Sequence, residues 1–176
     1  LCTRLFDTSP RRWAAAYPVG QSCRVLDWGS AVIRPATTDD VDAMAKTLGD
    51  WIVETPWMPD LHTPKDHVWY CGQLCLSQQV WVADCKSGVG FLALDQAEIS
   101  ALYLPNALRR NGWGKALLND AKSVATDLTL RTFQANTRAR AFYAREGFVE
   151  VELTDGATND EKLPDVRMQY ARGLRG

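Results

Sequence analysis

The sequence predicts a mixed α/β fold in which one sheet carries helices on both of its faces. Three strand-like segments, 79–86, 89–95 and 98–104, follow one another with only tight turns between them, which predicts an antiparallel meander. Farther along the chain, helix-like segments separate the strands, and such crossover connections favour parallel pairing. The segment 98–104 is apolar on both sides, as is typical of a central strand that is covered on both faces.

Hydrophobic spacing and capping residues predict the remaining elements. In the first helix, apolar residues recur at Val41, Met44, Leu48 and Ile52, after two acidic residues that suit a helix N-terminus. Further helices are predicted at 64–77, at 117–128 and at 136–146. Further strands are predicted at 31–36, 128–133, 148–153 and 166–170, with 155–165 as an exposed hairpin loop. The predicted order is β-α-α-β-β-β-α-β-α-β-β.

Length and composition predict one domain, 31–172, preceded by an N-terminal extension, 1–30, of unknown role. The formal net charge of -1 at pH 7 predicts neither a nucleic-acid nor a membrane partner. No apolar run approaches the roughly 20 residues that a membrane-spanning helix needs. The five cysteines and two histidines are not spaced as a metal site, so we expect no metal and reduced thiols in a cytoplasmic protein.

The segment RRNGWG, residues 109–114, carries the clearest chemical signal. It lies between a predicted buried strand and a helix, where main-chain N–H groups lack helical partners and the helix dipole is positive. Gly112 and Gly114 have no Cβ, so an anion can approach the main chain closely. Arg109, Arg110 and Lys115 add full positive charges. The segment therefore predicts a phosphate or pyrophosphate site.

Two common nucleotide-binding patterns do not fit this segment. The third glycine and the later acidic residue of the dinucleotide fingerprint are missing, and so is the GK[ST] ending of a P-loop. RRNGWG instead resembles the (Q/R)xxGx(G/A) motif of the GCN5-related N-acetyltransferase (GNAT) superfamily. A later segment, 136–148, reads NTRARAFYAREGF and resembles a second signature of that family. The resemblance covers about residues 31–172.

The resemblance implies the GNAT fold and acetyl-CoA as co-substrate. It places the pyrophosphate on the main chain of the turn, the pantetheine arm beside the preceding strand, and Asn136 against that arm. The implied cofactor-binding residues are Leu102, Tyr103, Leu104, Arg109, Arg110, Asn111, Gly112, Trp113, Gly114, Lys115 and Asn136. Asn136 can equally be the N-cap of the helix that it begins, and both roles can hold together.

Two residues are candidates for the chemistry. Tyr143 matches the tyrosine that relatives use as general acid toward the leaving thiolate, and pKa values of about 10 and 8.5 suit that transfer; its alternative is an aromatic core position. Glu98 resembles the glutamate that serves as base in the histone-acetylating branch of the family. Asp95 and water are the alternatives to Glu98.

The sequence thus predicts an N-acetyltransferase that moves an acetyl group from acetyl-CoA to a primary amine of a small molecule or peptide. Direct attack in a ternary complex is the implied route. The alternative is a non-catalytic CoA-binding module that acts as a sensor or assembly subunit. Trp51, Trp57 and Trp69 surround a proline-rich break, where they form either core or an aromatic acceptor pocket. The resemblance also allows a homodimer.

Overall fold

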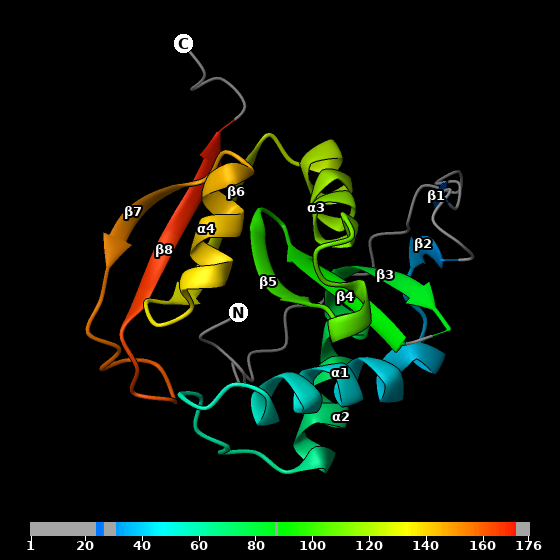
Figure 1. The fold of residues 1–176 in the computed structure, drawn as a ribbon, viewed down its shortest axis with the longest axis horizontal. Coiled ribbons are helices and arrows are strands. Elements are labelled where there is room, and N and C mark those ends of the chain that lie inside the picture. Colours follow the sequence, from blue (N-terminus) through cyan, green and yellow to red (C-terminus); the bar gives the residue numbers. More distant parts are fainter. Residues whose placement is uncertain (1–23, 27–30, 87, 172–176) are drawn as a thin grey trace.

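A computed structural model of the chain describes residues 24–26, 31–86 and 88–171 (Figure 1). The described strands are β1 (Arg24–Leu26), β2 (Ala31–Pro35), β3 (Gln79–Cys85), β4 (Gly88–Asp95), β5 (Glu98–Tyr103), β6 (Asp127–Phe133), β7 (Val149–Leu153) and β8 (Asp165–Ala171). The helices are α1 (Val41–Val53), α2 (Pro64–Ser77), α3 (Trp113–Val124) and α4 (Thr137–Arg145), with short 3-10 turns η1 (Thr38–Asp40) and η2 (Asn106–Leu108). The predicted mixed α/β class is confirmed.

One sheet contains the eight described strands, in the order β1-β2-β3-β4-β5-β6-β8-β7. The predicted meander β3-β4-β5 is antiparallel, and β5 with β6 is the parallel pair. The closing pair of β7 and β8 is antiparallel, also as predicted. In the sheet, β8 lies between β6 and β7, so α4 carries the chain past the position that β8 occupies.

Helices cover the two faces of the sheet in sequential pairs (Figure 1). Phe91 and Ala93 of β4 pack with the buried residues of α1 and α2, whereas Leu92 and Leu94 pack with those of α3. Because successive strand residues point to opposite faces, a strand that is apolar throughout must be covered on both sides. This is the physical reason why the central segments read as continuous apolar runs.

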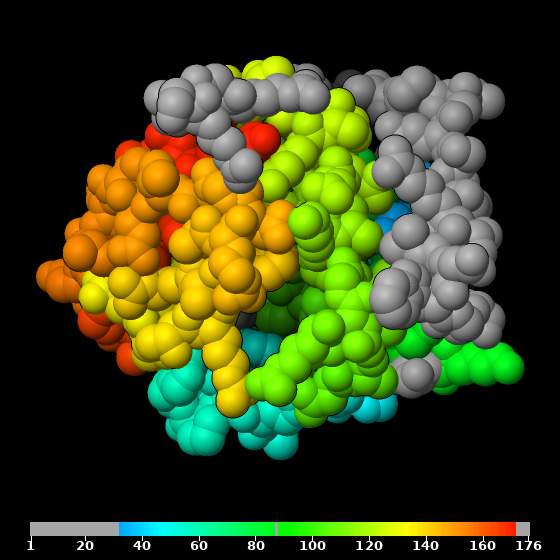
Figure 2. Space-filling view, turned by 45° about the horizontal axis from the view of Figure 1, so that its top comes forward, coloured from blue at the N-terminus to red at the C-terminus, as the bar shows by residue number. Residues whose placement is uncertain are grey.

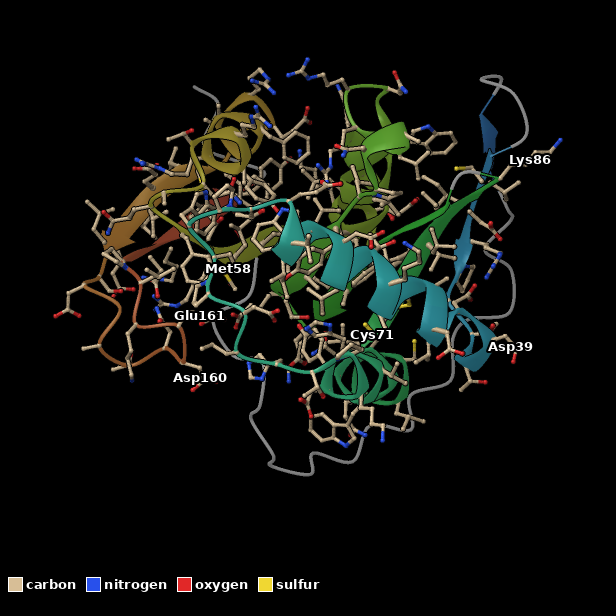
Figure 3. All side chains as sticks on the ribbon, turned by 60° about the horizontal axis from the view of Figure 1, so that its bottom comes forward. Asp39, Met58, Cys71, Lys86, Asp160 and Glu161 are labelled. Atoms are coloured by element: carbon tan, nitrogen blue, oxygen red, sulfur yellow. The ribbon has the colours of Figure 1, made fainter. Side chains whose placement is uncertain are left out.

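The described cysteines are free thiols. Cys71 lies between α1 and α2 (Figure 3), and burial raises the pKa of its thiol to about 12. A thiol with such a pKa is a core residue and not a nucleophile near neutral pH. Cys2 and Cys23, like most of the predicted extension 1–30, lie outside the described residues, although 24–26 pair with β2 as an edge strand. Over the described ranges, every helix is too short or too polar to cross a membrane.

The prediction of an exposed loop at 155–165 was wrong in part. Asn159 and Asp165 are each only 2% exposed, and burial raises the pKa of Glu161. Asp165 accepts hydrogen bonds from Arg131 Nη1 at 3.0 Å and from Asn159 Nδ2 at 3.1 Å. The loop packs beside residues 58–62, where Figure 3 shows Met58 and Glu161. The polar composition of the loop suggested exposure to solvent, but Arg131 of β6 is the charged partner that permits Asp165 to be buried.

Asp40 joins the start of α1 to the sheet. Its carboxylate receives Arg34 Nη1 at 2.8 Å and Nη2 at 2.7 Å, and it accepts the Thr37 N–H at 2.8 Å as part of a capping box. Arg34 also reaches Asp84 of β3 at 2.8 Å. The guanidinium of Arg34 and the N–H of Thr37 hold the pKa of Asp40 below its ordinary value of 3.8, against the opposing effect of burial.

We expect Asp40→Asn to lower the free energy of unfolding by about 1–3 kcal/mol at pH 7, the usual range for a hydrogen bond to a charged group. Because the pKa is depressed in the folded state, this contribution is present above the ordinary carboxyl pKa and is lost as the pH falls through the folded value. Urea unfolding between pH 3 and 7 measures this contribution, with Asp39→Asn as the control because Asp39 is exposed. Equal stability of the two variants at pH 7 would contradict the assignment.

Candidate functional site

A cavity of about 950 Å³ opens where β5 and β6 part. These strands share only the residue pairs Glu98–Thr129 and Ile99–Leu130, so their C-terminal halves are not paired with each other. The end of β5, the turn before α3, one side of α4 along its length and the segment at the end of α1 line the cavity. Figure 2 shows the corresponding hollow between the yellow α4 surface and the green α3 surface.

A chain of aromatic rings spans the gap between the two strand ends. Trp51 of α1 contacts Tyr103 at the end of β5, with ring centroids 5.6 Å apart. Trp57 lies 5.9 Å from Trp51 and 5.7 Å from Phe133 at the end of β6. Each contact is edge-to-face, a favourable geometry for aromatic pairs. Trp51 and Trp57 also line the cavity, so the aromatic pocket and the packing role both apply to them, whereas Trp69 is 44% exposed on α2.

The turn before α3 has the geometry of an anion site. Arg110 and Gly112 have left-handed backbones, with φ of 64° and 81°. Within the described part of the chain, the main-chain N–H groups of 110–115 donate no hydrogen bond, because the helix begins only with the bond from Ala116 N to Gly112 O at 2.9 Å. Consecutive unpaired N–H groups at the start of a helix attract phosphate oxygens. The N–H of Arg109 differs, since it donates to Asn106 O at 3.1 Å.

The two positions of the turn that hold glycine require it for different structural reasons. A Cβ at Gly112 would meet nothing within 4 Å, so that position needs glycine for its positive φ and not for space. A Cβ at Gly114 would lie 3.2 Å from Leu104 Cδ1 and 3.4 Å from Phe142 Cζ. Gly114 therefore allows α3 to approach both the end of β5 and α4.

Four cationic side chains line the cavity. Arg110 and Lys115 come from the turn, and Arg138 and Arg145 from α4. Across the described ranges, none of these four side chains forms an ion pair or hydrogen bond with another residue. Arg140 differs, because it forms a bidentate pair with Glu150 at 2.7 and 3.1 Å. Four uncompensated cations beside unpaired N–H groups suit a ligand with several phosphates.

The other predicted cofactor residues fall into two groups. Leu102, Tyr103, Leu104 and Asn136 line the cavity. Leu102 pairs with Leu92 of β4 and lies beyond the last pair with β6, so the opposite edge of β5 faces the cavity. Asn136 is the N-cap of α4, and its Oδ1 accepts the Ala139 N–H at 3.2 Å, which confirms the capping role.

Asn111 and Trp113 are not among the lining side chains. Asn111 Nδ2 donates to Ala107 O at 3.1 Å, which stabilises the turn, and Trp113 is 3% exposed in the core. Only their main-chain N–H groups remain for a ligand. Arg109 lines the cavity, but its side chain is committed to neighbours in the protein: Nε donates to Leu104 O at 2.8 Å.

The two predicted catalytic residues are not brought together. Tyr143 lines the cavity and is 2% exposed, with its ring between Phe142 at 5.1 Å and Phe148 at 5.4 Å. Glu98 lies at the opposite end of β5, paired in register with Asp95, and neither carboxylate lines the cavity. At about 3.3 Å of rise per residue, Glu98 is roughly 16 Å along the strand from Tyr103. The geometry does not support Glu98 or Asp95 as a base in this cavity.

Glu54, which the sequence did not single out, lies in the cavity wall. It is the C-cap of α1 and accepts hydrogen bonds from Asn106 Nδ2 at 2.7 Å and Arg109 Nη1 at 2.9 Å. Its position after an amphipathic helix gave no local signal, because its partners are more than 50 residues away.

Comparison with known proteins agrees with this geometry. Residues 77–150 match the family model of the acetyltransferase (GNAT) domain. A segment of 71 residues is 37% identical to the peptidyl-lysine N-acetyltransferase YjaB of Salmonella typhimurium, covering 39% of this chain and 49% of the relative. The chain thus spans about half the length of the curated relatives that it matches. The likeness to the GNAT family therefore rests on residues 77–150 of this chain.

Solved structures extend the likeness in fold. The apo form of YjaB from Escherichia coli superposes with a TM-score of 0.67 at 20% identity, covering 80% of this chain and 97% of the other. The structure of yncA from Salmonella typhimurium with acetyl-CoA superposes with a TM-score of 0.63 at 15% identity, covering 84% of this chain and 97% of the other. The chain therefore has the GNAT fold, with the matched segment 77–150 extending from β3 to β7.

We expect Gly112→Ala to weaken the binding of CoA by about 10-fold, since a left-handed backbone costs a residue with a Cβ roughly 1–2 kcal/mol and the turn will relax away from it. Isothermal titration with CoA measures the change. Gly72→Ala in α2 is the matched control, because a Cβ there also meets nothing within 4 Å and no positive φ is needed. Unchanged affinity in a folded Gly112→Ala variant would argue against phosphate binding at the turn before α3.

Proposed function

We propose that this chain is an acetyl-CoA-dependent N-acetyltransferase that acts on a primary amine of a small molecule or peptide. The observation that carries the proposal is the run of unpaired N–H groups at 110–115, at one end of a cavity that Tyr143 also lines. The names of its curated relatives, peptidyl-lysine N-acetyltransferases, support a peptide amine as one acceptor class.

In the proposed complex, the turn with Arg110 and Lys115 holds the phosphates of the donor, and Arg138 and Arg145 of α4 add positive charge. The exposed edge of β5 at Leu102–Leu104 offers main-chain groups to the two amides of the pantetheine arm, as a partner strand would. Asn136 Nδ2 has no partner within the described residues, so it can bind the arm while Oδ1 caps α4. Leu104 O is not among the groups offered to the arm, because it already accepts Arg109 Nε at 2.8 Å.

The transfer itself is proposed as a direct attack. The amine nitrogen forms a bond to the thioester carbonyl carbon, and the carbon–sulfur bond breaks to release the CoA thiolate. Tyr143 would donate a proton to that thiolate, and the proton that the nitrogen loses as the amide forms would return through water to the Tyr143 phenolate. The attacking ammonium must first lose a proton, and we assign that step to water in the cavity, since Glu98 and Asp95 lie outside it.

Release of free thiol from acetyl-CoA tests this function across a panel of amines, aminoglycosides, amino acids and lysine peptides. We expect thiol release that depends on both substrates, and an acetylated product detected by mass spectrometry. Binding of CoA without thiol release for any acceptor would favour the other candidate, a non-catalytic CoA-binding module.

Tyr143→Phe tests the proton donor. We expect turnover to fall by about 100-fold, the typical contribution of a general acid, while the affinity for CoA stays within twofold. Tyr70→Phe is the control, because Tyr70 is also buried, at 5% exposure, but does not line the cavity. If Tyr143→Phe turns over as fast as the Tyr70→Phe control, the phenol is not the donor.

A further inference from the structure

A small network of hydrogen bonds lies beside the cavity. Arg109 Nη1 donates to Glu54 Oε2 at 2.9 Å and to Asn106 Oδ1 at 2.6 Å, while Asn106 Nδ2 donates to Glu54 Oε1 at 2.7 Å. Arg109 Nε closes the network on Leu104 O at 2.8 Å. The network thus joins the end of α1 to the end of β5 and to the turn before α3. We call these four residues the Glu54 clamp.

Each side of the clamp is anchored in the core. On one side, Leu108 of η2 is 4% exposed, which fixes the flanking Asn106 and Arg109. On the other side, Ile52 of α1 is 5% exposed and accepts the Thr55 N–H at 3.0 Å. The clamp therefore connects two independently anchored parts, and its carboxylate sets the distance between them.

The segment on the α1 side carries the aromatic wall. Thr55 Oγ1 donates to Trp51 O at 2.6 Å, and Met58 N donates to Thr55 O at 2.9 Å, so the chain turns back immediately after Glu54. This turn places Trp57 against Trp51 at the cavity surface. A shift of Glu54 would move both indoles relative to Leu104.

The ion pair within the clamp is too exposed to act mainly on stability. The side chains of Glu54 and Arg109 are 38% and 30% exposed, and pairs of this kind contribute about 0–1 kcal/mol to folding. Their geometric effect is larger in principle, because a misplacement of about 1 Å between reacting groups can cost up to about 100-fold in rate.

We infer that Glu54 is a positioning residue, which aligns the acceptor wall formed by Trp51 and Trp57 with the donor strand through Arg109. The inference rests on the proposed acetyl transfer. It also explains the hydrogen bonds of the Arg109 side chain. Arg109 is the first residue of the phosphate turn, yet its guanidinium binds Leu104 and Glu54 and not a group of the turn. Glu54 needs to exchange no proton in this role.

The variant Glu54→Ala separates positioning from structural support. We expect kcat/KM for the acceptor to fall at least about 10-fold, through both a higher acceptor KM and a lower kcat. The Kd for acetyl-CoA should stay equal or become lower, since Arg109 then loses its carboxylate and can turn toward the phosphates. A general loss of structure would instead weaken the binding of both substrates. Asp50→Ala is the matched control on α1, because it removes an exposed pair with Lys46 outside the cavity.

A double variant tests whether Glu54 acts through Arg109. If it does, Glu54→Ala combined with Arg109→Ala has the same acceptor KM as Arg109→Ala alone, because the contact is already lost. Multiplicative effects of the two changes would overturn the inference. So would an acceptor KM in Glu54→Ala equal to that of Asp50→Ala while the unsubstituted chain is active. No thiol release by the unsubstituted chain would overturn the proposed function itself, and the positioning role with it.

Discussion

The parting of β5 from β6 is the constraint on which the rest of this structure depends. Two residue pairs join the strands at one end, and at the other end four rings, from Tyr103 through Trp51 and Trp57 to Phe133, separate them. Parallel strands that continued side by side would pair their main-chain groups and close the sheet. Because the rings prevent this, the edge of β5 remains open beyond Ile99, and a cavity of about 950 Å³ forms within an otherwise continuous sheet.

The opening explains why the chemically distinct parts of the chain meet in one place. The turn before α3 follows β5 directly, and α4 follows β6 directly, so the start of each helix reaches the cavity. The turn before α3 presents unpaired N–H groups beside Arg110 and Lys115, α4 adds two further cations, and the end of α1 presents two indoles and the carboxylate of Glu54. An anionic donor and an amine acceptor would therefore enter from chemically different sides, with the Glu54 clamp holding those sides in register.

Sequence reasoning succeeded where the physical cause is local. The turn at 109–114 was predictable because glycines, basic residues and a helix start are neighbours in the chain, and the faces of the central strands follow from their alternation. Features that depend on distant partners were missed: Glu54 meets Arg109 across 55 positions, and Asp165 is buried because Arg131 of β6 reaches it. The insertion of β8 between β6 and β7 is likewise a choice among strand partners, which no local pattern specifies. Glu98 was considered on an offset along the chain, and β5 carries it away from the cavity.

Amide chemical shifts of the isotopically labelled chain, recorded during titration with acetyl-CoA, test the central claim most directly, namely that the unpaired N–H groups of 110–115 bind the donor phosphates. The account predicts that the largest shifts, and slowed exchange with solvent, occur at 110–115, with smaller changes at Leu102–Leu104 and none at the distant Arg34 and Asp84. Saturable binding that leaves the amides of 110–115 unchanged would contradict it.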